Sequence, residues 1–188
     1  KRQRAVKELL AVGGWPASLG SLPLADEVFD ADGISVERLK AAGAIAAVQT
    51  TSSEFGATNQ TTTKIHGATR NPWNLERTPG GSSGGSAAGV AGGLFALATA
   101  SDGGGSIRIP AGFCGLIGLK STFGRIPRGP GSILGNATAV EGTVSRSTRD
   151  AARYLDVTNG FDPRDPRGLP RVEGYEAGLG SCADEIRS

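Results

Sequence analysis

The sequence contains no methionine, and its 188 residues begin with Lys1. A translated chain starts with methionine, and a chain of this length normally holds several more. We therefore expect Lys1 to mark a truncation or processing point rather than the start of a gene. The length suits one domain or part of a larger one.

Residues that bind metals or form disulfides are scarce. The chain has two cysteines, Cys114 and Cys182, and one histidine, His66. Two cysteines are too few for a disulfide framework, and their spacing with His66 fits no zinc pattern. We expect two reduced thiols, no metal and no cofactor.

Strong net charge and long apolar runs are also missing. With 20 basic and 18 acidic residues, the net charge is only +2, which gives no electrostatic case for binding nucleic acid or a membrane surface. No apolar run approaches the ~18–20 residues of a membrane span. We expect a cytoplasmic protein, and interpret the basic cluster of Lys1, Arg2, Arg4 and Lys7 as a solvated chain end.

Glycine is abundant instead, with 30 residues in the chain. Many of them fall between Gly80 and Gly135, interleaved with apolar runs. This placement differs from that of a linker or a collagen repeat, and it indicates tight turns and close backbone approach.

Helical and strand patterns alternate along the chain. Helices are predicted at 35–42 with Gly43 as a left-handed stop, from 83 to 90, and from Ser147, with Asp150 as capping partner, to near Gly160. Buried strands are predicted at 44–49, 94–100 and 116–120. This order is typical of an α/β domain whose sheet is covered by helices on both faces. A Pro-rich loop follows from about residue 161, so the sheet looks incomplete at its C-terminal side.

Two glycine–serine stretches interrupt this pattern, at 79–86 and 102–110. A linker would not abut two buried segments, and a phosphate loop would need a terminal Gly-Lys-Ser/Thr. The second stretch follows a predicted strand, at the sheet edge where α/β proteins place their sites. Its three glycines leave backbone N–H groups open for an oxyanion hole, and Ser106 follows them at a predicted helix start.

A nucleophilic serine needs a base, and His66 is a poor choice. It lies in a polar stretch, and no Asp/Glu–His–Ser spacing recommends it. A G-x-S-x-G nucleophile elbow is missing as well, because the sequence around Ser106 is Gly-Gly-Ser-Ile-Arg. A Ser–His–Asp hydrolase is therefore a poor fit.

The stretch from Gly80 to Lys120 resembles the core of the amidase signature family. It reads GGSSGGSAAGVAGGLFALATASDGGGSIRIPAGFCGLIGLK. The upstream residues 67–73 and the GGWPASLGS segment at 13–21 are similar to other parts of the family, and weaker resemblance extends from about Val6 to Pro166. The resemblance implies a mixed β-sheet core and makes residues 1–188 a partial amidase signature domain.

The resemblance implies a Ser–cis-Ser–Lys triad. Ser106 resembles its nucleophile, Ser82 the bridging serine in a cis peptide, and Lys7 the base. An oxyanion hole from the backbone around Gly103, Gly104, Gly105 and Ser106 is implied too. Phe55 and Gly56 are candidates for the acyl pocket, and Arg108 for a structural or pocket-shaping role.

Some residues depart from the family pattern. Residues 1–5 are basic where the family has an apolar strand, Glu8 stands where Asp is usual, and Ser121 follows Lys120 where Pro is common. The alternative interpretation of Lys7 is an exposed surface lysine. Family members also need a second stretch of comparable size to complete the sheet and pocket.

Three functions are compatible with these motifs. The first is hydrolysis of a small carboxylic amide, by a chain that could form a homodimer. The second is the glutaminase subunit of a tRNA-dependent amidotransferase, although the SDGGGS form of the second motif looks more like free-standing amidases. The third is an inactive, truncated remnant. The sequence does not indicate which amide is the substrate.

Overall fold

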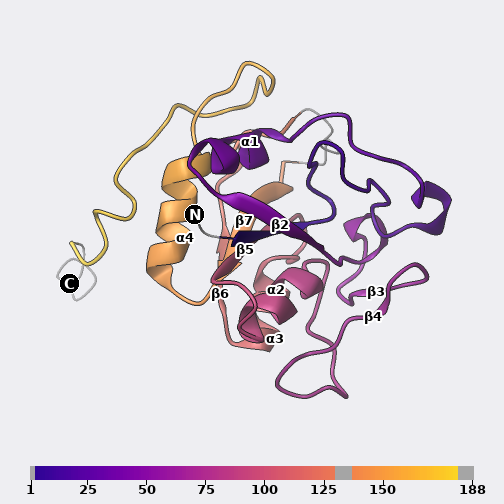
Figure 1. The fold of residues 1–188 in the computed structure, drawn as a ribbon. Helices are drawn as coiled ribbons and strands as arrows, with labels where there is room; N and C mark the ends of the chain where they lie inside the picture. The colour runs from indigo at the N-terminus through magenta and orange to yellow at the C-terminus, as the bar shows by residue number, and fades with distance from the viewer. Residues whose placement is uncertain (1–2, 130–136, 182–188) are drawn as a thin grey trace.

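The fold is built on a five-stranded sheet with the order β2-β1-β5-β7-β6 (Figure 1). The computed structural model describes residues 3–129 and 137–181. The strands are β1 (Gln3–Lys7), β2 (Ile45–Thr50), β5 (Leu97–Asp102), β6 (Ile117–Lys120) and β7 (Val140–Ser145).

The sheet is mixed, as predicted. β1 pairs in parallel with both β2 and β5, whereas β7 runs antiparallel to β5 and β6. A separate two-stranded ladder joins β3 (Thr62–Thr63) to β4 (Gly67–Ala68). Because β1 and β5 run the same way side by side, their carboxyl ends meet at one edge of the sheet.

Helices cover both faces of the sheet, which confirms the predicted fold class. α2 (Gly84–Ala91) and α3 (Arg108–Cys114) lie against one face, and α1 (Ile34–Ala41) and α4 (Thr148–Thr158) pack on the other (Figure 1). Two short 3-10 helices, η1 (Leu22–Leu24) and η2 (Glu54–Gly56), lie in the connections.

The alternation of β5 separates two apolar cores. Ala98 and Ala100 are buried with Val90 of α2, whereas Leu97 packs with Leu39 of α1 and Tyr154 of α4. Successive side chains of a strand point to opposite faces, so one strand contributes to both layers. The small side chains on the first face allow α2 to approach the sheet closely.

Two of the predicted helix ends agree with the structure. The Ser147 hydroxyl accepts the N–H of Asp150 at 3.1 Å and donates to its carboxylate at 2.8 Å, which caps α4. Gly43 follows α1 with a φ of 85°, the left-handed conformation that glycine adopts without strain.

The predicted strands need corrections at two places. β5 begins at Leu97 rather than at Leu94, whose side chain is 73% exposed in the preceding loop. β2 occupies the predicted segment but is not a buried strand, because it lies at the sheet edge and Ile45 and Val48 are exposed. A short apolar run does not distinguish a strand at the edge of a sheet from one at its centre.

The sequence patterns missed two inner strands. β1 reads QRAVK and β7 reads VEGTVS. Both carry charged residues, so neither has the continuous apolar run of a buried strand, yet β7 is buried along its whole length. Lys7 of β1 and Glu141 of β7 are buried beside hydrogen-bond partners, Ser82 and Ser35 respectively, rather than exposed to solvent.

Within the part of the chain that the structure describes, no helix is long and apolar enough to cross a membrane. The stretch from Phe161 to Ser181 forms turns and isolated bridges, without a helix or a longer strand. Lys1, Arg2 and Cys182 lie outside the described residues.

Candidate active site

Lys7 occupies the carboxyl end of β1, inside the protein. Its side chain is fully buried, and its backbone N–H donates to the Thr99 hydroxyl of β5 at 2.9 Å. Arg4 is buried as well, at 9% exposure. The interpretation of the basic cluster as a solvated end is therefore wrong for Arg4 and Lys7.

The Lys7 amino group lies within hydrogen-bond distance of three hydroxyl groups. Its Nζ is 2.7 Å from Ser82 Oγ, 2.8 Å from Ser83 Oγ and 3.0 Å from Ser101 Oγ. Ser82 and Ser83 precede α2, and Ser101 lies on β5. A lysine side chain has three hydrogen-bonding positions, so these hydroxyls occupy all of them.

The pKa of Lys7 is lowered from 10.5 to about 7. Burial, which disfavours the charged ammonium, is the largest cause, and the negative charges of Glu8 and Asp102 oppose it. A lysine with this pKa holds a large neutral fraction at physiological pH, whereas a solvent-exposed lysine is almost fully charged.

Ser82 is held in a tight loop before α2. The peptide bond between Gly81 and Ser82 is cis, as the resemblance implies. At Gly85, a Cβ atom would lie 2.5 Å from the backbone nitrogen of Thr51. Only glycine fits there, and this close approach seats the start of α2 beside the end of β2.

Ser106 and Ser82 line the same cavity, named here the serine cavity. Its volume is about 220 Å³, and its other lining residues are Leu9, Leu10, Phe55, Gly56, Ser101, Asp102, Gly103, Arg128, Ala139, Val140 and Glu141. Ser106 lies in the turn before α3, which begins two residues later than predicted. Its carbonyl accepts the N–H of Ser83 at 3.3 Å, which ties the two motifs together.

Phe55 and Gly56, the candidates for the acyl pocket, lie in the wall of this cavity. Phe55 has a φ of 51°, which is unusual for a residue other than glycine, and Gly56 has a φ of 72°. A Cβ atom at Gly56 would lie 2.9 Å from Leu9 and 3.4 Å from Ser82 Oγ. A side chain at position 56 would therefore crowd the space beside Ser82.

Asp102 fixes the glycine loop that precedes Ser106. Its buried carboxylate accepts the backbone N–H groups of Gly105 at 2.8 Å and Ile107 at 3.1 Å, and the Arg108 guanidinium at 3.0 and 3.1 Å. Burial acts to raise the pKa of Asp102, but these hydrogen bonds outweigh it and lower the pKa to about 2. Arg108 thus has a structural partner.

The hydrogen bond from the Gly105 N–H to Asp102 removes one donor from the predicted oxyanion hole. Because the Gly105 N–H points to Asp102, it is committed to the protein. Gly103, Gly104 and Ser106 are the remaining candidates for that hole, and Gly103 lines the serine cavity.

Several contacts around the site had no signal in the sequence. Glu8 accepts His66 Nε2 at 2.9 Å, Ser18 Oγ at 3.4 Å and the backbone N–H of Ser52. His66 therefore contacts the neighbour of Lys7 rather than Ser106. Ser83 and Ser101 contact Lys7, but only the tertiary fold brings them there.

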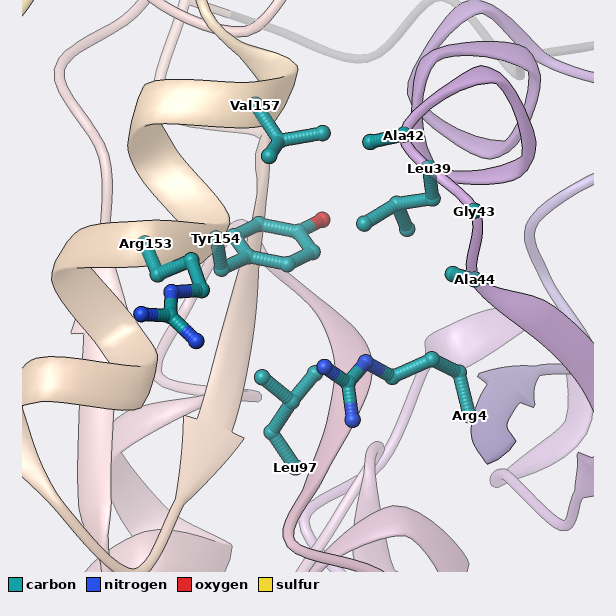
Figure 2. A pocket seen from close by; sticks show the side chains of 9 residues that line it. All are labelled: Arg4, Leu39, Ala42, Gly43, Ala44, Leu97, Arg153, Tyr154 and Val157. Atoms are coloured by element: carbon teal, nitrogen blue, oxygen red, sulfur yellow. The ribbon is translucent and has the colours of Figure 1, made fainter. Parts of the chain in front are cut away.

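A second cavity, of about 360 Å³, lies between α1 and α4 (Figure 2). It is named here the α1–α4 cavity and is lined by Arg4, Leu39, Ala42, Gly43, Ala44, Leu97, Arg153, Tyr154 and Val157. Figure 2 shows the Tyr154 hydroxyl pointing toward α1, between Leu39 and Ala42. None of the predicted catalytic residues lines it, so the serine cavity is the candidate active site.

Metal chemistry has no evident set of ligands in residues 3–129 and 137–181. No group of three or more His, Cys, Asp or Glu side chains there is arranged to hold an ion. Cys114 is buried, and burial raises the pKa of its thiol to about 11, which disfavours the thiolate that binds metals.

Comparison with protein families finds one that matches most of the chain. The family model described as amidase matches residues 4–184. Among curated proteins, a glutamyl-tRNA(Gln) amidotransferase subunit of Oleidesulfovibrio alaskensis is 44% identical over 180 residues, which are 95% of this chain and 37% of the relative. The chain thus spans little more than a third of the curated relatives that it matches.

Solved structures with the same fold include several amidases. A bacterial aryl acylamidase of the amidase signature family has a TM-score of 0.87 at 36% identity, covering 96% of this chain and 38% of the other. The peptide amidase of Stenotrophomonas maltophilia has a TM-score of 0.84 at 32% identity, covering 93% and 37%. The corresponding glutamyl-tRNA(Gln) amidotransferase subunit of Thermotoga maritima has a TM-score of 0.86 at 34% identity, covering 91% and 38%.

Proposed function

Because this chain belongs to the amidase family, we propose that it supplies the catalytic residues of an enzyme that hydrolyses a small carboxylic amide. The products are the acid and an amine or ammonia. We assign Ser106 as nucleophile, Ser82 as bridging serine and Lys7 as base, within a partial amidase signature domain of residues 1–188. The observation that carries this proposal is the buried Lys7 amino group, 2.7 Å from Ser82 Oγ.

The proposed reaction begins with neutral Lys7. Lys7 accepts the Ser82 proton while Ser82 accepts the Ser106 proton, and Ser106 Oγ attacks the amide carbonyl carbon. The pKa of Lys7, about 7, supports this role because the neutral amine is well populated. The relay then runs in reverse, the leaving amine takes the proton, and the C–N bond breaks to leave an acyl-enzyme. Water, activated through the same serine and lysine, releases the acid and frees Ser106.

The negative charge of the tetrahedral intermediate requires preorganised donors. We assign this role to the backbone N–H groups of Gly103, Gly104 and Ser106. Asp102 supports the assignment because it holds the Gly105 and Ile107 N–H groups on either side of Ser106. A loop fixed in this way needs no reorganisation when the intermediate forms.

Covalent labelling tests the nucleophile. The full-length protein is treated with a serine-reactive fluorophosphonate, and the modified peptide is mapped by mass spectrometry. We expect label on Ser106, with labelling lost on denaturation and in Ser82→Ala, and Ser106→Ala should lower amide turnover on the order of 10³-fold or more. Label on another residue of the native protein would overturn the assignment.

A second candidate function is the glutaminase subunit of a tRNA-dependent amidotransferase. The observation that favours it is the 44% identity to a glutamyl-tRNA(Gln) amidotransferase subunit. Such a protein would pass ammonia to a partner instead of releasing it. Glutamine hydrolysis that depends on co-purifying subunits would support this function, and efficient hydrolysis of simple amides by the protein alone would favour the amidase.

An inactive remnant is the third possibility. A single cooperative unfolding transition of residues 1–188 would count against misfolding.

We further propose a cytoplasmic location and a homodimer. Cell fractionation of the full-length protein would test the location, and sedimentation would test the oligomeric state.

A further inference from the structure

The serine cavity has a second polar region, formed by Arg128 and Glu141. Both residues line the cavity together with Ser82 and Ser106. Glu141 lies on β7, and Arg128 lies in the connection between β6 and β7. A molecule that fills the cavity would therefore contact the serines and this region at once.

Arg128 is buried, and one of its donor atoms is unused. Its side chain is 7% exposed, and its backbone N–H is fixed by the Asp165 carboxylate at 2.9 Å. Its guanidinium carbon lies 5.8 Å from the centre of the Phe123 ring. Within residues 3–129 and 137–181, its Nη2 atom has no hydrogen-bond partner. A buried guanidinium donor without a partner is costly. Nη2 has almost no exposed surface of its own, so a ligand group that reaches it as it fills the cavity would gain a hydrogen bond.

The other charged groups of the cavity wall already have partners. The Asp102 carboxylate is held by Arg108 and the backbone of the glycine loop. The Glu141 carboxylate accepts the Ser35 hydroxyl, and burial raises its pKa to about 7. The ionised Asp165 and the Arg167 guanidinium also act on Arg128, with opposite effects on its pKa. Among the described residues of this wall, Arg128 is the cation whose guanidinium keeps a donor without a hydrogen-bond partner.

Resting on the proposed function, we propose that Arg128 binds a carboxylate on the acyl part of the substrate. The preferred substrates are then small monoamides of dicarboxylic acids, with the amide at Ser106 and the carboxylate at Arg128. A guanidinium matches the planar geometry of a carboxylate and forms charge-assisted hydrogen bonds with it. The cavity volume of about 220 Å³ favours a short chain between the two groups.

Two substrates that differ in one group test this proposal. For the full-length enzyme, kcat/KM is measured with succinamate and with butyramide, which has a methyl group in place of the carboxylate. We expect succinamate to be preferred by on the order of 10- to 100-fold. Equal kcat/KM values, or a preference for butyramide, would overturn the role of Arg128 while leaving the amidase proposal intact.

The variant Arg128→Met separates recognition from a structural role. It should bring the succinamate-to-butyramide ratio of kcat/KM close to one, whereas a merely structural role would lower both values and keep the ratio. Arg125→Met is the matched control, because Arg125 lies in the same connection but donates to the Pro170 carbonyl at 2.8 Å. The control should keep the ratio of the wild type.

Calorimetry tests the same contact without hydrolysis. We expect Ser106→Ala to bind succinamate at least tenfold more tightly than butyramide, and Arg128→Met added to Ser106→Ala should abolish this difference. If the wild-type protein hydrolyses neither amide, the proposed function fails, but this measurement still decides the role of Arg128. Equal binding of the two amides to Ser106→Ala would overturn the inference.

Discussion

The two cavities lie at opposite ends of the same two strands, and their side chains differ. β1 contributes Arg4 to the α1–α4 cavity and Lys7 to the site beside the serine cavity. β5 likewise begins with Leu97 in the α1–α4 cavity and ends with Asp102 in the serine cavity. The same backbone thus supplies two environments a few residues apart.

The difference lies in the buried polar groups that β1 and β5 supply near each cavity; Arg128 of the serine cavity, whose Nη2 atom lacks a partner within residues 3–129 and 137–181, comes from neither strand. At the carboxyl ends of the strands, Lys7 contacts Ser82 of the loop before α2 and Ser101 of β5, and Asp102 accepts the N–H of Gly105. In the α1–α4 cavity, the Tyr154 hydroxyl has no partner among the described residues. Preorganised polar contacts are typical of a catalytic site, and they gather where α/β sheets place their sites. A cavity alone does not identify the active site.

The largest effect is expected from Lys7→Met in the full-length enzyme. Removing the proposed base should lower kcat/KM for an amide by roughly 10²- to 10⁴-fold. In the wild type, kcat/KM should rise with pH up to about 7 and then level off, because the neutral amine is the reactive form and the pKa of Lys7 is about 7. A pH–rate profile from pH 5.5 to 9 checks this.

The exposed Lys40 provides the control for that substitution, since it pairs with Asp32 at 2.7 Å away from the site. Lys40→Met should keep both the rate and the profile. A wild-type rate that does not change between pH 6 and 8 would contradict the neutral-lysine mechanism.

A smaller effect is expected from Asp102→Asn. The amide cannot hold both Arg108 and the backbone N–H groups of the loop, so kcat should fall by roughly 10- to 100-fold, with a loss of about 2 kcal/mol in the free energy of unfolding. Since the pKa of Asp102 falls from 3.8 to about 2 on folding, its stabilisation is present above pH 4 and is lost as the pH drops toward 2.

Denaturant unfolding at pH 7 and pH 2.5 checks this prediction. The difference in stability between wild type and Asp102→Asn should be smaller at the lower pH. An equal difference at both values would show that the carboxylate charge is not what holds the loop.

The smallest effect is expected in the α1–α4 cavity, from Tyr154→Phe. Removing a buried hydroxyl without a partner should raise the free energy of unfolding by about 1 kcal/mol, or ~2–4 °C in Tm, and leave amide hydrolysis unchanged. Thermal unfolding and a turnover assay on the same samples check both parts. A drop in activity would erase the contrast between the two cavities, and a lower Tm would reveal a partner for the hydroxyl.

The motifs with distinctive composition were the ones that could be predicted. The glycine–serine stretches and the spacing of Lys7, Ser82 and Ser106 indicated the amidase resemblance, which the family match over residues 4–184 confirms. Helix ends such as Ser147 and Gly43 were predictable because capping depends on one or two local residues. The catalytic roles themselves stay predictions.

The strand features that the sequence did not predict share a physical cause. β1 and β7 contain Arg4, Lys7 and Glu141, which local patterns assign to solvent. These side chains are buried because partners from distant segments receive them, such as Ser82 for Lys7 and Ser35 for Glu141. The edge position of β2 likewise depends on which strands pair, and not on its own composition.

The sequence by itself determined the α/β class, the helix ends and the residues from which a site could be made. Only the tertiary structure decided that Lys7 is buried, that Gly105 is committed to Asp102, and that Arg128 shares a cavity with Ser106. Local structure follows from contacts a few residues apart. The pKa of a buried group, and whether a buried donor finds a hydrogen-bond partner, depend on residues far away in the sequence. Lys7 and Ser82, for example, are 75 residues apart.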